Sequence, residues 1–163
     1  PTLMHSEIFD QPKALKHAYE VNIAKLAAYL ELNKATVLSY LSSMAKAELL
    51  HLLYSDNKSV TKMQKPDKIY IHNPNMLCAL GEAMNIGTLR ECFAVNQLSV
   101  NHTVEYGKSQ GDFRVDGRWT FEVGGHDKSF EQIANVPDSF VLADDMDFPI
   151  GKKIPLWLMG LTY

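Results

Sequence analysis

Two carboxylates flank a predicted β-hairpin, and they are the first candidates for chemistry in this sequence. The Asp-Gly pair at 116–117 is a strong signal for a two-residue hairpin turn. Residues 113–115 and 119–123 alternate in the manner of two strands on either side of that turn. Asp112 precedes the first strand and Glu122 lies in the second. The hairpin can therefore bring these two carboxylates onto adjacent strands.

A helix–turn–helix followed by a two-stranded ribbon is the second candidate. Apolar residues at helical spacing predict helices over 21–30 and 34–49, and alternation predicts strands over 50–54 and 68–72. This order is typical of the winged helix-turn-helix, whose second helix enters the DNA major groove by its first turns. The residues there that are expected to contact nucleic acid are Asn33, Lys34, Thr36, Ser39 and Tyr40.

The loop between those two strands, the wing, is rich in lysine. Residues 58–68 carry a net charge of +3, which is a modest electrostatic footprint for phosphate binding. The wing residues expected to contact nucleic acid are Lys58, Lys62 and Lys65. Two alternatives stay open. The lysines can simply solvate a hairpin tip or protect a strand edge. Lys34 is also the only cation in the first three turns of its helix, so the module can instead bind protein.

The remaining segments predict a small α/β unit. Its expected helices cover 74–80, 88–99, 129–134 and 155–161, and its expected strands cover 104–106, 113–115, 119–123 and 140–143. Residues 81–87 are expected to form a loop, after which Thr88 and Glu91 have the spacing of a helix capping box. A further helix is predicted to begin near Pro12. The fold class is therefore α+β, with an N-terminal helix and winged helix over 1–75 and a second domain over 76–163.

Composition excludes several protein classes. The 163 residues are 46% apolar and 21% charged, as in an ordinary folded chain, and no apolar run approaches the ~20 residues of a membrane-spanning helix. Two cysteines cannot form a disulfide framework, and no pair among the six histidines has metal-ligand spacing on a helix face. These features favour a cytoplasmic protein with no membrane partner. Residues 1–75 carry a net charge of +2 and residues 76–163 carry −5, which indicates two modules.

Short motifs spread over nearly the whole chain resemble a large prokaryotic family of AAA-type ATP-binding proteins. The segments that carry the resemblance are 22–27, 33–37, 49–53, 68–70, 73–75, 88–91, 96–98, 111–113 and 121–123. Members of that family have an N-terminal ATPase domain, a winged helix and a C-terminal domain similar to restriction endonucleases. The chain lacks a phosphate-binding loop and a starting Met. The resemblance therefore implies a C-terminal fragment, whose missing ATPase domain holds ATP and is its partner in cis.

The resemblance also implies a metal site. Restriction-endonuclease-like domains bind Mg²⁺ with an Asp and with the Glu of a Glu-x-Lys motif, often with a further Glu from the first helix. The matching positions are Asp112, Glu122 and Glu91, but Gly124 stands where the lysine is expected. Lys128 lies beyond the Gly-Gly pair at 124–125 and would have to turn back to replace it.

The missing lysine leads to the expectation that the nuclease-like domain is non-catalytic. The chain is then a DNA- or protein-binding region with no cofactor of its own. Two alternatives stay open: a Mg²⁺-dependent nuclease that uses Asp112 and Glu122, and a purely structural interaction module. A structure that places the Lys128 ammonium within hydrogen-bond reach of the two carboxylates would weaken the expectation of inactivity.

Overall fold

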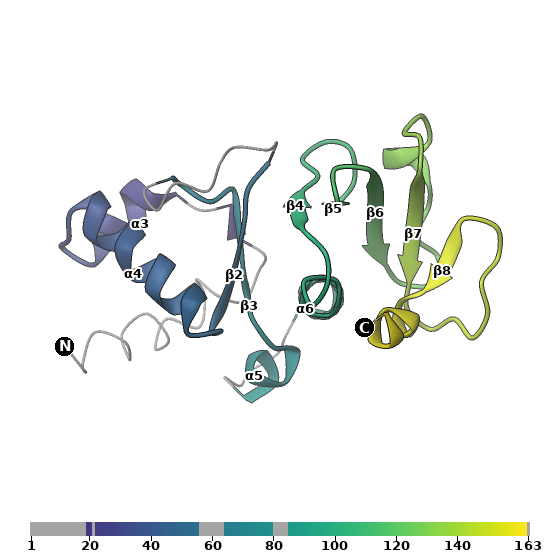
Figure 1. The fold of residues 1–163 in the computed structure, drawn as a ribbon, viewed down its shortest axis with the longest axis horizontal. Coiled ribbons are helices and arrows are strands. Elements are labelled where there is room, and N and C mark those ends of the chain that lie inside the picture. The colour runs from purple at the N-terminus through teal and green to yellow at the C-terminus, as the bar shows by residue number, and fades with distance from the viewer. Residues whose placement is uncertain (1–18, 21, 56–63, 80–84, 163) are drawn as a thin grey trace.

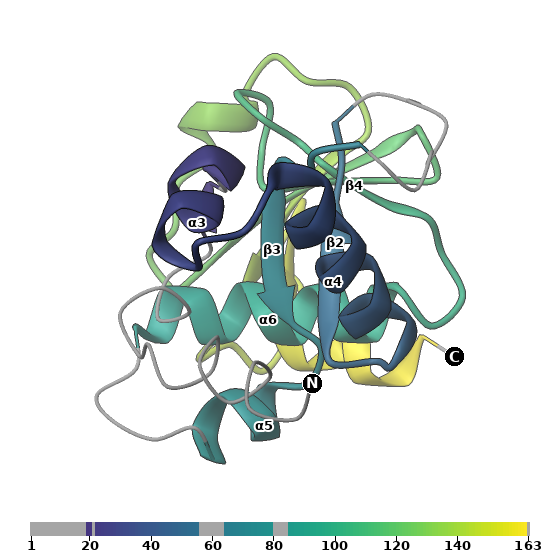
Figure 2. The same ribbon diagram turned by 90° about the vertical axis from the view of Figure 1, so that its left-hand side faces the viewer.

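The computed structural model describes residues 19–20, 22–55, 64–79 and 85–162, and these form a mixed α+β structure with two sheets. Figure 1 shows α3 and α4 on the outer side of the smaller sheet and α6 between the two sheets, and Figure 2 shows α6 behind β2 and β3. The smaller sheet has the order β1-β3-β2, and the larger has the order β4-β5-β6-β7-β8. The helix expected near Pro12 lies outside the described residues.

Two asparagine-capped helices begin the N-terminal half. The Asn22 side chain accepts a hydrogen bond from the Lys25 amide, and the Asn33 side chain accepts one of 2.8 Å from the Thr36 amide. The second helix packs on the sheet, whose strands are all antiparallel. The elements of this half are β1 (Tyr19–Glu20), α3 (Ile23–Tyr29), α4 (Lys34–Lys46), β2 (Leu50–Leu53), β3 (Lys68–Ile71) and α5 (Pro74–Ala79).

The C-terminal half is built around the larger, mixed sheet. Its first three strands form an antiparallel meander, and β7 and β8 then run parallel to β6. Asp116 and Gly117 both have positive φ angles, as a tight hairpin turn requires, so the predicted hairpin is confirmed. The elements are α6 (Ile86–Leu98), β4 (Val104–Tyr106), β5 (Phe113–Val115), β6 (Trp119–Gly124), η1 (Glu131–Ile133), β7 (Ser139–Ala143), β8 (Lys153–Pro155) and η2 (Leu156–Leu161).

Several sequence predictions need correction. Helix α6 begins at Ile86, inside the expected loop, because the Asn85 side chain accepts hydrogen bonds from the Gly87 and Thr88 amides. The predicted capping box is therefore wrong, since Thr88 lies inside the helix. The segments expected as helices over 129–134 and 155–161 are short 3₁₀ helices, and the edge strands β1 and β8 were not predicted.

One apolar core extends through both halves of the chain. It contains residues of α3, α4 and β2 together with residues of α6, β5 and β6. The rings of Tyr70 and Phe113 meet edge to face at 5.8 Å, and the Cys92 thiol donates a hydrogen bond to the Ile71 carbonyl. Strand β3 and helix α6 are thereby held together. No helix among the described residues has the length and apolarity to cross a bilayer.

Candidate active site

The hairpin brings Asp112 and Glu122 together, as the turn signal predicts. The Asp112 amide donates to the Phe121 carbonyl, and the Asp112 carboxylate accepts a 2.8 Å hydrogen bond from the Val123 amide. Glu122 follows on β6, in the centre of the larger sheet, and its side chain is only 1% exposed. Its Oε2 atom has no hydrogen-bond partner among the described residues. A buried carboxylate oxygen without a partner is costly, so this atom marks a place for a ligand.

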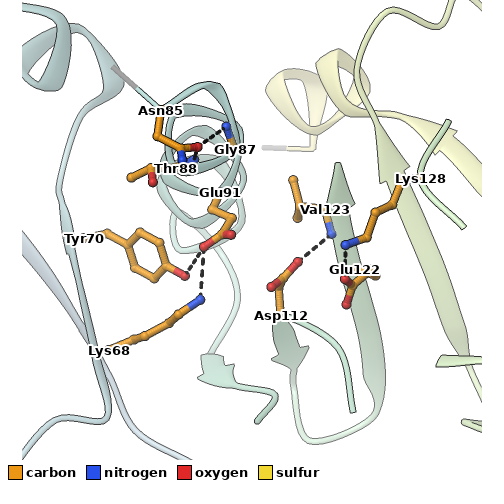
Figure 3. Close-up of polar contacts among 10 residues, drawn as sticks. All are labelled: Lys68, Tyr70, Asn85, Gly87, Thr88, Glu91, Asp112, Glu122, Val123 and Lys128. Atoms are coloured by element: carbon orange, nitrogen blue, oxygen red, sulfur yellow. Dashed lines mark hydrogen bonds and ion pairs between the residues drawn. The ribbon is translucent and has the colours of Figure 1, made fainter. Parts of the chain in front are cut away.

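Lys128 turns back across Gly124 and forms an ion pair with Oε1 of Glu122. A Cβ atom on residue 124 would lie 2.6 Å from both Cγ and Cδ of Lys128, which is too close for any side chain. The glycine therefore leaves the space through which this lysine reaches the site. Burial alone would lower the pKa of Lys128, but the hydrogen bond and charge of Glu122 outweigh it and raise the pKa. Figure 3 shows the ammonium directly beside the Glu122 carboxylate, at the end of a side chain that comes in from the side opposite to Asp112.

Glu91 belongs to this site and caps no helix. Its Oε2 accepts a 2.7 Å hydrogen bond from the Tyr70 hydroxyl and lies 3.1 Å from the Lys68 ammonium. Both donors come from β3, on the other side of α6 from the larger sheet, and Figure 3 shows the Glu91 carboxylate between Tyr70 and Asp112. The Lys68 ammonium also lies over two rings, 5.4 Å from the centroid of Tyr70 and 5.2 Å from that of Tyr106.

The charges of these side chains act on Asp112, which lies between the other two carboxylates. Burial raises the pKa of Asp112 to about 6, and the charges of Glu91 and Glu122 act in the same direction. The Val123 amide and the Lys68 charge act against this rise. With all groups ionised, three carboxylates face two ammonium groups, so the cluster has one net negative charge. It is therefore suited to attract a cation.

The chemistry of these donors suits a divalent cation. Carboxylate oxygens are the ligands that Mg²⁺ prefers, and Glu122 presents one buried oxygen with no other partner. The described residues contain no group of three His, Cys, Asp or Glu side chains already placed to hold a metal. Asp112 and Glu122 would hold the ion. Glu91 would join them as a third ligand only if its side chain adopted another conformation or its ion pair with Lys68 broke.

The predicted nucleic-acid contacts lie apart from this cluster and are only partly available. The Asn33 side chain already caps α4, and its Oδ1 atom also accepts a 3.0 Å hydrogen bond from the Thr36 hydroxyl. Lys34 and Ser39 are exposed on α4, and Tyr40 is half-buried. In the wing, Lys65 is exposed. The predicted contacts Lys58 and Lys62 lie outside the described residues.

Two residues of the cluster were not predicted as part of it. Lys68 was counted only in the charge of the wing, and Tyr70 was given no role. Their spacing of two in a predicted strand places both side chains on one face, but nothing local indicates that this face meets α6. Comparisons with protein-family models, curated proteins and solved structures found no match to this chain.

Proposed function

We propose that the C-terminal half is a divalent-metal-dependent nuclease domain and that the N-terminal half binds the nucleic acid. The proposed metal ligands are Asp112 and Glu122, and Lys128 is the cation beside them. We further propose that the chain is the C-terminal region of an AAA-type ATPase. The ATPase domain of that protein would bind ATP and act on this region in cis. This part rests on the sequence resemblance alone.

The order and pairing of the elements support two finer fold assignments. In the N-terminal half, two helices precede a pair of antiparallel strands, and β1 completes the sheet. This arrangement favours a winged helix. In the C-terminal half, a helix is followed by an antiparallel meander and then by two parallel strands, with one carboxylate directly before β5 and another on the neighbouring β6. This arrangement favours a restriction-endonuclease-like domain.

The single observation that carries the proposal is the path of Lys128 over Gly124. The expectation of an inactive domain rested on the absence of a lysine at position 124. A lysine four residues later places its ammonium on Glu122 because residue 124 has no side chain. The cation required near the developing charge is thus supplied from another position.

The chemistry is hydrolysis of a phosphodiester, in which water attacks phosphorus and one bridging P–O bond breaks. A bound Mg²⁺ would supply Lewis acidity and lower the pKa of a bound water. Oε2 of Glu122 has no other partner among the described residues and would be available to hold that ion, while the other oxygen pairs with Lys128. The Val123 amide fixes the direction of the Asp112 carboxylate. Lys128 is placed to stabilise negative charge on the phosphate as it develops.

A non-catalytic DNA- or protein-binding region is the second candidate. It is favoured by the partners that the carboxylates already have: Lys68 and Tyr70 for Glu91, and Lys128 for Glu122. Such pairing can exist purely to satisfy buried charge. In that case the domain binds without cleaving, and a cation does not change its affinity for nucleic acid.

Cleavage assays with single- and double-stranded DNA in Mg²⁺ or Mn²⁺ separate the two candidates. The nuclease proposal expects cleavage that EDTA stops and that Asp112→Ala abolishes. Arg118→Met is a matched control, because this exposed arginine, directly before β6, pairs with Asp138 and its replacement removes a positive charge outside the cluster. No cleavage of either substrate, together with no heat of Mn²⁺ binding, would refute the proposal and leave the binding module.

A further inference from the structure

The second lysine of the cluster, Lys68, has a position that the proposed metal site leaves unexplained. Its side chain is 11% exposed, and its ammonium contacts Glu91 on the opposite side of the cluster from Lys128. In Figure 3 the two lysines lie at either end of a row formed by Glu91, Asp112 and Glu122. Lys68 comes from the N-terminal half, whereas all three carboxylates come from the C-terminal half.

We infer that Lys68, which strand β3 contributes to the metal site, contacts the phosphate of the substrate. Without metal and substrate, its ammonium pairs with Glu91 instead. This inference depends on the proposed function, because it assigns a partner to the same site. It implies that the two halves of the chain build one centre. The N-terminal half then supplies part of the substrate site as well as the surface that binds nucleic acid.

The charge of the cluster supports an anionic partner. Three carboxylates and two lysines leave one net negative charge, and a divalent cation changes this to one net positive charge. A phosphodiester carries one negative charge and would restore neutrality. The Lys68 charge already acts on Asp112. A divalent cation held by Asp112 and Glu122 would therefore repel the ammonium, which weakens its ion pair of 3.1 Å with Glu91.

The surroundings of Lys68 allow this exchange at low cost. The faces of Tyr70 and Tyr106 lie beneath the ammonium and attract it whether or not Glu91 is paired. The Tyr70 hydroxyl keeps its 2.7 Å hydrogen bond to Glu91 after the lysine moves, so the carboxylate does not lose every partner. Lys68 also starts the strand that follows the wing, three residues after the exposed Lys65. Strand β3 is thereby the segment that joins the predicted wing to the cluster in sequence.

The test measures how affinity for a hydrolysis-resistant phosphorothioate duplex, which keeps one negative charge on each phosphate, depends on salt with Mn²⁺ and with EDTA. Each phosphate contact contributes about 0.9 to the slope of log K against log salt. Lys68→Met should lower the slope by about 0.9 in Mn²⁺ and should leave it unchanged in EDTA, where the lysine rests on Glu91. The same variant should bind Mn²⁺ several-fold more tightly in calorimetry, because a positive charge leaves the cluster. Lys68→Arg should restore the slope.

These outcomes distinguish a phosphate contact from a structural lysine. A structural lysine would change the slope equally in Mn²⁺ and EDTA, or would weaken Mn²⁺ binding together with the fold. Asn96→Ala is the matched control, because Asn96 donates to the His72 carbonyl and also joins α6 to the end of β3, away from the carboxylates. If the wild type binds Mn²⁺ and Lys68→Met keeps the full slope, the inference is wrong and the nuclease proposal stands. If the wild type binds no Mn²⁺, both are overturned.

Discussion

Replacement of Asp112 by Asn should stabilise the metal-free protein at neutral pH. Burial, followed by the charge of Glu91, raises the pKa of Asp112 from 3.8 to about 6 in the folded state. The unfolded chain holds this carboxyl near its ordinary pKa, so ionised Asp112 costs the fold about 3 kcal/mol at pH 8, at 1.36 kcal/mol for each pKa unit. Asn has almost the same shape, and its carbonyl oxygen can still accept the hydrogen bond from the Val123 amide.

The pH dependence gives the sign of the effect. Between about pH 4 and pH 6 the folded state binds more protons at Asp112 than the unfolded state does, so wild-type stability falls as the pH rises through this window. Asp112→Asn removes that fall. The difference between the two proteins should be close to zero at pH 4 and reach about 3 kcal/mol above pH 7, or ~6–12 °C in melting temperature for a chain of this size.

Thermal and urea denaturation in EDTA, at several values of pH between 4 and 8, measure this difference. Asp116→Asn is the control of opposite sign, because the Thr103 amide and His102 lower the pKa of the exposed Asp116. That variant should be less stable than wild type by a nearly constant amount over this pH range, because a carboxyl with a lowered pKa stabilises the fold at any pH above its ordinary pKa of 3.8. Excess Mn²⁺ should stabilise wild type and narrow its gap to Asp112→Asn. If Asp112→Asn is no more stable than wild type at pH 8, the electrostatic account of the cluster is wrong.

Three further predictions concern activity and binding. Lys128→Met should lower the rate of metal-dependent cleavage ~100- to 1,000-fold with little change in duplex affinity, measured by single-turnover kinetics and by anisotropy. Gly124→Ala should cause a similar loss, because its Cβ would overlap the Lys128 side chain; full activity would contradict the proposed lysine path. The triple replacement of the wing lysines should flatten the salt dependence of duplex binding in Mn²⁺ and in EDTA alike, and an unchanged slope would exclude the wing from the interface. The wing lysines to be changed to Ala are Lys58, Lys62 and Lys65.

Much of the local structure follows from short-range patterns. The hairpin at 116–117 is confirmed because two residues with positive φ favour one kind of turn. The capping role of Asn33 is likewise confirmed, since the cap needs only a side chain next to the first helical amides. The predicted start of α6 is wrong because two capping signals compete. The Asn85 side chain accepts hydrogen bonds from the amides of Gly87 and Thr88, and the helix therefore starts earlier than Thr88.

The sequence by itself determined the α+β class, the pairing of two carboxylates across one hairpin and the absence of a lysine at position 124. Only the tertiary structure decided what surrounds those carboxylates. Lys128 reaches Glu122 because Gly124 has no Cβ atom to block its side chain. This steric fit is set by the tertiary structure, and no periodic sequence pattern indicates it. Lys68 reaches Glu91 across 23 positions because β3 packs against α6. Such contacts depend on how whole elements pack, and local patterns carry no information about that packing.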